Sequence, residues 1–144
     1  MLLSSRYPIS VQQAHVLVIE DKLDNLAVIQ KLLAYSGIPS EHCSYKTVST
    51  GILQFAECFE RIDLILLDLF FSADPISGYD ILREIRSHPQ FKDTRVVAIT
   101  GHAQEMKQTR AAGFDGFIAK PFLRDRFPDQ IKRILAGESV WECK

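Results

Sequence analysis

The chain has 144 residues, of which 47% are hydrophobic and 24% are charged, and its net charge is -1. This length suits one domain with a single core, and the lack of a basic excess argues against binding to nucleic acid through phosphate neutralisation. No apolar run of about 18 residues is present, so no membrane-spanning helix and no membrane partner are expected. Three cysteines without a C-x-x-C pair favour reduced thiols and a cytoplasmic protein.

Short apolar runs alternate along the chain with segments of helical spacing. Residues 1–14 have no sustained period and are predicted to be an N-terminal extension. Apolar runs predict strands, the second of them weak, at residues 15–19, 41–47, 64–67, 95–99 and 116–119. Apolar residues at helical spacing predict a helix after each strand, around residues 26–33, 52–59, 81–85, 103–112 and 127–135. Residues 137–144 are predicted to be a C-terminal tail.

Repeated strand-then-helix units in residues 15–136 predict a single α/β domain. Such units form a parallel sheet with helices on both faces, which is the doubly wound class, here with five strands and five helices. Ligands of this class bind outside the carboxyl ends of the strands. The residues that end or follow the predicted strands are therefore the candidates for chemistry.

Four of the predicted strands lead into residues suited to phosphoryl chemistry. Glu20 and Asp21 follow the first strand, and Asp68 follows the third. Thr100 follows the fourth strand and Lys120 the fifth. Carboxylates gathered at one edge repel each other unless a cation shares the site, and a site made of oxygen ligands suits Mg²⁺. A hydroxyl and an ammonium would bind phosphoryl oxygens, and an aspartate beside a metal can form an aspartyl phosphate.

Each of these residues alone has an ordinary structural explanation, as a helix cap or a solvated loop residue, and only their joint placement is specific. The segments that carry them resemble the bacterial response-regulator receiver family over residues 15–136. The matching motifs, in chain order, are VLVIED, DLILLDL, ITGHA and AGFDGFIAKPF. The last motif is the most specific of the four. The resemblance implies a flavodoxin-like sheet with strand order 2-1-3-4-5.

The resemblance implies that Asp68 is the phosphoryl acceptor. It also implies a Mg²⁺ site made of Asp21, Asp68 and the backbone carbonyl of Phe70, with Glu20 acting indirectly. Glu20 stands where an aspartate is commoner in the family, and it keeps the carboxylate. The loop after Asp68 is two residues longer than is usual, because Gly78 comes ten residues after Asp68.

The resemblance also implies residues that respond to the phosphoryl group and residues that affect its hydrolysis. Thr100 and Lys120 would bind phosphoryl oxygens, and the Lys120–Pro121 bond would be cis. Phe117 would turn toward the core when Thr100 moves. Phe70 and His102 would flank the water that hydrolyses the aspartyl phosphate, and the apolar Phe70 ring should slow that reaction.

The resulting hypothesis is a stand-alone response regulator that receives its phosphoryl group from a sensor histidine kinase or a phosphotransfer protein. It would catalyse only its own phosphorylation and dephosphorylation, and it would signal to a protein target through its fourth helix, fifth strand and fifth helix. A homodimer is left open.

Three alternatives differ in their sequence requirements. A scaffold with the same fold but no phosphorylation is disfavoured by the complete set of site residues. A flavin carrier needs a Ser/Thr/Gly-rich phosphate loop where Glu20 and Asp21 stand, and these would repel the phosphate. An aspartyl phosphohydrolase needs a second aspartate at the position of Phe70.

Overall fold

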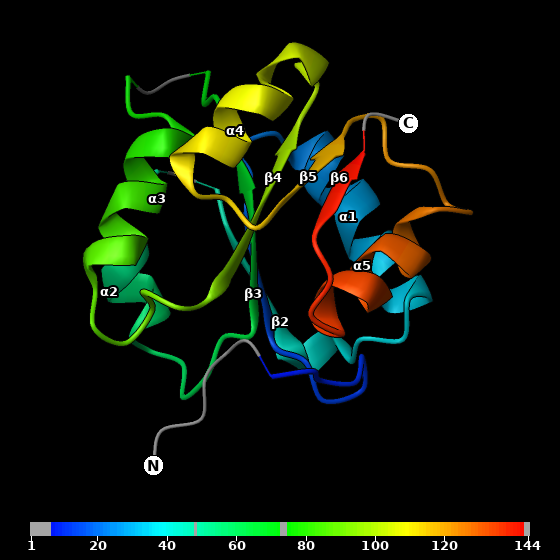
Figure 1. Cartoon of the computed structure of the whole chain (residues 1–144). Coiled ribbons are helices and arrows are strands. Elements are labelled where there is room, and N and C mark those ends of the chain that lie inside the picture. The colour runs from blue at the N-terminus through cyan, green and yellow to red at the C-terminus, as the bar shows by residue number, and fades with distance from the viewer. Residues whose placement is uncertain (1–6, 48, 73–74, 143–144) are drawn as a thin grey trace.

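A computed structural model describes residues 7–47, 49–72 and 75–142, in which a single parallel sheet lies between two layers of helices (Figure 1). The strands are β1 (Val16–Ile19), β2 (Cys43–Lys46), β3 (Leu64–Asp68), β4 (Arg95–Thr100), β5 (Gly116–Ala119) and β6 (Val140–Glu142). The helices are α1 (Leu23–Tyr35), α2 (Ile52–Ala56), α3 (Gly78–Ser87), α4 (Met106–Ala112) and α5 (Phe127–Leu135). Short 3-10 turns at Ser40–His42 and Ala103–Glu105 precede β2 and α4.

The order of the strands is β2-β1-β3-β4-β5-β6, and all the pairs are parallel. The predicted order 2-1-3-4-5 is therefore confirmed for the first five strands. Every residue of β1, β3, β4 and β5 is buried, because helices cover both faces of the sheet. The sequences of these strands are therefore mostly apolar, with polar residues only at the ends of β3 and β4.

Two apolar clusters fill the space on either side of the sheet. One contains the inward side chains of α1 and α5, such as Ile29 and Ile131. The other contains those of α2 and α3, such as Ile52 and Ile81. Alternate residues of each strand contribute to opposite clusters, as the pleat requires. Among the described residues, no helix is both long and apolar enough to cross a membrane.

The described parts of the predicted extension and tail, residues 7–14 and 137–142, pack against the domain. In the described part of the N-terminal extension, Val11 and Ala14 are buried, and the Ile9 amide donates to the Leu135 carbonyl of α5 at 2.9 Å. This segment therefore packs against the α1–α5 layer.

The C-terminal segment adds a sixth strand to the predicted five-stranded sheet, within the predicted tail at residues 137–144, of which residues 143 and 144 lie outside the described residues. Residues 140–142 form β6, which extends the sheet beyond β5. Val140 is fully buried, and Gly116 faces it across the pair. A Cβ atom on Gly116 would lie 2.8 Å from the Val140 carbonyl oxygen, so glycine permits this close approach. A strand of three residues is too short for hydrophobic periodicity to predict it.

Gly116→Ala should displace β6, because the new methyl group overlaps the Val140 carbonyl. We expect a loss of about 1–3 kcal/mol in the free energy of unfolding, which is typical of overpacking. Urea denaturation followed by circular dichroism measures this loss, and the emission of Trp141, the single tryptophan, reports on β6. Gly101→Ala is the control, because a Cβ there meets nothing within 4 Å. Equal stability of the two variants would contradict the prediction.

Candidate functional site

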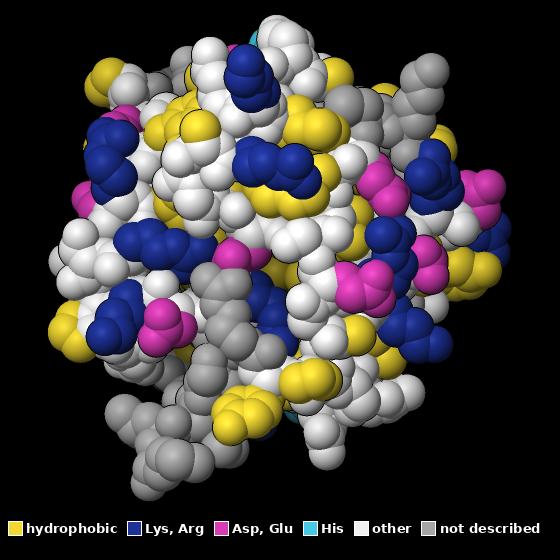
Figure 2. Space-filling model, viewed as in Figure 1, with side chains coloured by type: hydrophobic (Ala, Val, Ile, Leu, Met, Phe, Trp, Pro, Cys, Tyr) yellow, Lys and Arg dark blue, Asp and Glu magenta, His cyan; other side chains and the backbone are white. Residues whose placement is uncertain are grey.

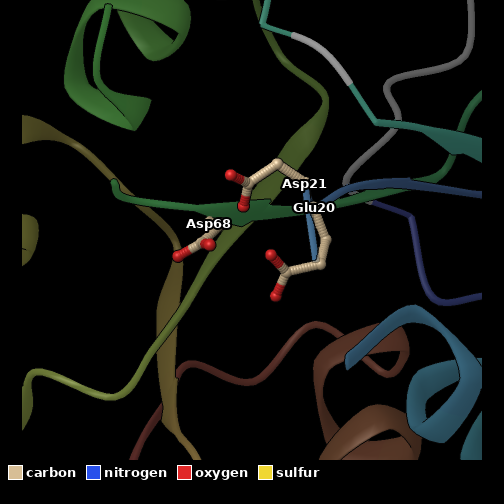
Figure 3. A group of neighbouring side chains, drawn as sticks. All are labelled: Glu20, Asp21 and Asp68. Atoms are coloured by element: carbon tan, nitrogen blue, oxygen red, sulfur yellow. The ribbon is translucent and has the colours of Figure 1, made fainter. Parts of the chain in front are cut away.

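Three carboxylates meet at the carboxyl edge of the sheet. Glu20 and Asp21 follow β1, and Asp68 is the last residue of the neighbouring strand β3. One oxygen from each carboxylate lies within 4.8 Å of the others. Their side chains turn toward a common region beyond the strand ends (Figure 3). Glu20 and Asp68 are only 0% and 5% exposed, so their charges need partners inside the protein.

Lys120 supplies the positive partner. Its Nζ atom donates to Glu20 Oε1 at 2.6 Å and lies 3.4 Å from Asp68 Oδ2. Lys120 follows β5, and its amide donates to the Thr100 carbonyl at 2.7 Å. The Lys120–Pro121 bond is cis, as expected from the resemblance. One ammonium thus partners two buried carboxylates and leaves the site with an excess of negative charge.

Asp68 is held in an environment that resists its ionisation. Burial raises the pKa of Asp68 to about 7, and Glu20 adds to the rise while the ammonium of Lys120 opposes it. The Leu69 amide donates to Asp68 Oδ1 at 2.8 Å, which fixes the direction of the carboxyl group. A second positive charge at the site would therefore favour the ionised, nucleophilic form of Asp68.

Asp21 is held by hydrogen bonds to one of its two carboxylate oxygens. Its Oδ2 atom accepts from both the amide and the hydroxyl of Ser72, at 2.9 and 2.7 Å. Burial alone would raise the pKa of Asp21, but these hydrogen bonds outweigh it and lower the pKa. Its Oδ1 atom is buried and has no hydrogen-bond partner among the described residues. Buried polar atoms are normally satisfied, so an ionised oxygen of this kind beside Asp68 fits a bound Mg²⁺.

Thr100 lies at the same edge and is 1% exposed. It ends β4, the strand that pairs with β3, and Asp68 faces its neighbour Ile99. The Thr100 hydroxyl oxygen accepts from the His102 amide at 3.1 Å. The structure thus places Thr100 at the end of the strand next to Asp68, as predicted.

Phe117 is fully buried on β5, in the cluster that α2 and α3 cover. It faces Ala98 of β4 on one side and Trp141 of β6 on the other. The ring of Phe117 is therefore already packed in the core in this conformation, and it does not have to turn inward from solvent.

Phe70 and His102, the predicted pair at the mouth of the site, are in contact. Their rings meet edge to face with centroids 5.1 Å apart, and Phe70 is 44% exposed. The ring of Phe70 thus pairs with His102 and stays partly open to solvent. Ligation by the backbone carbonyl of Phe70 stays a prediction.

Gly78 explains how the lengthened loop returns to the site. Its amide donates to the Leu69 carbonyl at 2.7 Å. A Cβ atom at Gly78 would lie 2.3 Å from the Asp68 carbonyl oxygen, which only glycine avoids. Ser77 then begins α3 through a reciprocal capping pair with Asp80. Gly78, after this loop, thus lies tightly against the main chain of the predicted acceptor.

Ser72 and the contact of Gly78 with Asp68 were not predicted as parts of the site. The spacing from Asp68 to Gly78 was visible in the sequence, and it was a signal for this contact. Nothing in the sequence singles out Ser72, because its partner Asp21 lies 51 residues away.

Comparisons with known proteins identify the family of the chain. The family model of the response regulator receiver domain matches residues 16–132. The chain is 26% identical to the two-component response regulator ARR7 of Arabidopsis thaliana, over 94% of the chain and 69% of the relative. It is 32% identical to the hybrid signal transduction histidine kinase G of Dictyostelium discoideum, over 78% of the chain and 3% of that long protein. The chain thus spans 69% of one of these relatives and a small part of the other.

Solved structures show the same fold. The chemotaxis protein CheY4 of Vibrio cholerae superimposes with a TM-score of 0.71 at 20% identity, over 84% of this chain and 98% of that chain. The receiver domain of the sensor histidine kinase PA1611 of Pseudomonas aeruginosa, solved with a magnesium ion coordinated in its active site cleft, gives 0.68 at 26% identity, over 87% and 98%.

The parallel sheet, the helices on both of its faces and the acidic edge define a doubly wound α/β domain with a carboxylate cluster at its strand ends. The chain belongs to the response-regulator receiver domain family. Receivers of this family are signalling domains and bind Mg²⁺ at an acidic pocket, and the cluster formed by the carboxylates of Glu20, Asp21 and Asp68 is consistent with such a pocket.

Asp68→Asn should stabilise the metal-free protein at pH 8 and do so less at pH 5. The pKa of Asp68 is raised from 3.8 to about 7, so the folded chain is stabilised by the bound proton at low pH and loses this as pH rises through 7. The amide of the variant does not ionise, so its folded state does not lose stability in this way. Urea denaturation in a chelator at both pH values measures the difference, which should be on the order of 2 kcal/mol at pH 8. A variant no more stable than wild type at pH 8 would show that ionised Asp68 costs nothing.

Proposed function

We propose that this receiver accepts a phosphoryl group on Asp68 from a phosphohistidine of a sensor histidine kinase or a phosphotransfer protein. The observation that carries the proposal is the buried Asp68 carboxyl, which lies near an Asp21 oxygen that has no hydrogen-bond partner among the described residues and 3.4 Å from Lys120 Nζ. The relatives that are histidine kinases or parts of them support a donor of this kind.

The residues of the site also fit a bound Mg²⁺, in agreement with the ion in the Pseudomonas aeruginosa receiver. Asp21, Asp68 and the backbone carbonyl of Phe70 would hold it, and Glu20 would act indirectly. When bound, the ion supplies positive charge that offsets the carboxylates and the phosphoryl oxygens. Its presence would favour the ionised form of Asp68, whose pKa is raised without it.

The transfer itself needs only Asp68 as a reacting group of this chain. A carboxylate oxygen of Asp68 bonds to phosphorus, and the phosphorus–nitrogen bond to the donor imidazole breaks. The imidazole leaves with the electron pair of that bond and takes up a proton. The short Leu69–Asp68 hydrogen bond keeps the second carboxyl oxygen away from the attack.

Two side chains then change partners. Lys120 shifts from Glu20, 2.6 Å away, toward a phosphoryl oxygen. The Thr100 hydroxyl, which accepts from the His102 amide, turns to donate to another phosphoryl oxygen. Because Phe117 is already buried, the movement of Thr100 would alter how Phe117 packs in its core cluster, against which Met106 of α4 also packs. The face formed by α4, β5 and α5 would carry this change to a protein target.

The first test is covalent modification by acetyl phosphate, a small phosphoryl donor. Intact-mass measurement should show one added phosphoryl group, which corresponds to about 80 Da for one PO₃H unit, and only when Mg²⁺ is present. Asp68→Asn should remove it, because an amide is a far poorer nucleophile. Asp125→Asn, which alters an exposed aspartate beyond β5, should leave it unchanged. A phosphorylated Asp68→Asn protein would rule out this acceptor.

The second test concerns how long the aspartyl phosphate lasts. The ring of Phe70 stands beside His102 at the mouth of the site, cannot hydrogen-bond a water and should exclude it. We expect Phe70→Asn to hydrolyse the aspartyl phosphate about tenfold faster, a change of about 1.4 kcal/mol in the barrier. Timed phosphate release from Mg²⁺-loaded protein measures this rate. Tyr35→Asn, at an exposed aromatic residue that ends α1, is the control. Equal rates for Phe70→Asn and wild type would show that this ring does not guard the water.

A further inference from the structure

The short strand β6 lies along the outer edge of β5, between α4 and α5 (Figure 1). Gly116, Phe117 and Ile118 pair with Val140, Trp141 and Glu142 in parallel register. This is the face of the domain that we propose for output. In this conformation the chain itself covers the edge of β5.

The first two residues of β6 fill an apolar part of this surface. Val140 is fully buried above Gly116, where no side chain stands in its way. Trp141 lies beside Phe117 at the margin of the core. Arg110 of α4 covers the indole, with its guanidinium carbon 4.5 Å from the ring centroid. A tryptophan stacked under an arginine is a favourable cation–π arrangement.

The third residue of β6 is held by α5 through charge. Glu142 accepts from Gln130 at 2.7 Å, from Arg133 at 3.0 Å and from Arg126 at 3.2 Å. Basic and acidic side chains lie interleaved over α5 beside β6 (Figure 2). The hydrogen bond from Gln130 and the charges of the two arginines lower the pKa of Glu142, although burial opposes them. This surface therefore selects an acidic residue two positions after an aliphatic one.

The strand β6 is short, and an exposed connection joins it to α5. The connection from α5 runs through exposed residues 137–139, and Gly137 has a positive φ of 102° that ends the helix. The strand has three residues, and only Val140 among them is fully buried. An edge strand of three residues, paired with the sheet on one side alone, belongs to the part of a fold that opens locally.

We propose that the outer edge of β5 is a binding site for an extended peptide with an aliphatic, an aromatic and an acidic residue in that order. The site lies between Arg110 of α4 on one side and Gln130 and Arg133 of α5 on the other. β6 is its internal ligand, and a protein partner that uses this site must displace it. Strand addition at a sheet edge supplies main-chain hydrogen bonds, and the side-chain pockets supply the specificity. The idea rests on the proposed function only in naming the partner as the output target.

The tethered strand has a large advantage over a free peptide. A short linker gives it an effective concentration on the order of millimolar, so a peptide in solution competes poorly with intact β6. Weakening β6 without altering the site should therefore reveal the site to a free peptide. Trp141→Ala/Glu142→Ala in the full chain does this, because both changes lie in the ligand. Ser139→Ala, at an exposed position in the same segment, is the matched control.

The probe is a fluorescein-labelled peptide with the sequence of residues 137–142, and its binding is followed by fluorescence anisotropy. We expect the double variant to bind it at least tenfold more tightly than do the wild type and Ser139→Ala. A peptide with alanine in place of its tryptophan and its last glutamate should not bind. A double variant that binds the peptide no better than the wild type, or binds both peptides equally, would overturn the proposal.

Hydrogen exchange of the wild-type chain provides a second measurement that does not depend on the variant's folding. Amides of β6 should exchange at least tenfold faster than those of β5, through local opening. Exchange of both strands at one rate, by global unfolding alone, would show that β6 is an integral strand and would overturn the proposal. Both measurements are made without a phosphoryl donor or Mg²⁺. A failure of Asp68 phosphorylation therefore leaves their result standing, and the reverse also holds.

Discussion

The ion pair between Lys120 and the buried carboxylates of Glu20 and Asp68 is the interaction on which the rest of the structure depends. It joins the ends of β1, β3 and β5, three strands far apart in the chain. Buried carboxylates without a positive partner would be costly. The charges of this ion pair do not balance, because one ammonium faces two carboxylates and the Asp21 carboxylate lies beside them. The acidic edge is therefore stable enough to fold and still suited to receive a cation.

The carboxylates of Asp21 and Asp68 are also held by hydrogen bonds from uncharged groups, which fix their orientation. Ser72 fixes Asp21 with two hydrogen bonds, and the Leu69 amide fixes Asp68 with one. Gly78 presses against the Asp68 main chain where any side chain would collide. The hydrogen bonds from Ser72 and Leu69 orient these carboxylates without adding a positive charge. A site oriented in advance spends little free energy on rearrangement when the phosphoryl group arrives.

Strand β5 connects the chemistry with the surface of the domain. It leads into Lys120 at its carboxyl end, carries Phe117 in the core, and pairs with β6 along its outer edge. Under the proposed function, a change in the partners of Lys120 or in the packing of Phe117 would therefore alter the strand with which Trp141 is paired. Competition between β6 and a partner would make the output depend on this one edge strand, because both events use the same main chain.

The sequence by itself determined the alternation of strands and helices, the order of the first five strands through family motifs, and the set Glu20, Asp21, Asp68, Thr100 and Lys120. It could do so because parallel strands bring their carboxyl ends to one edge, so that position along the chain predicts position in space. Only the tertiary structure decided that Ser72 holds Asp21, that Phe117 is already buried, and that residues 140–142 form a sixth strand. These features depend on contacts between distant segments or on a strand too short to have a period, and such contacts leave no local pattern in the sequence.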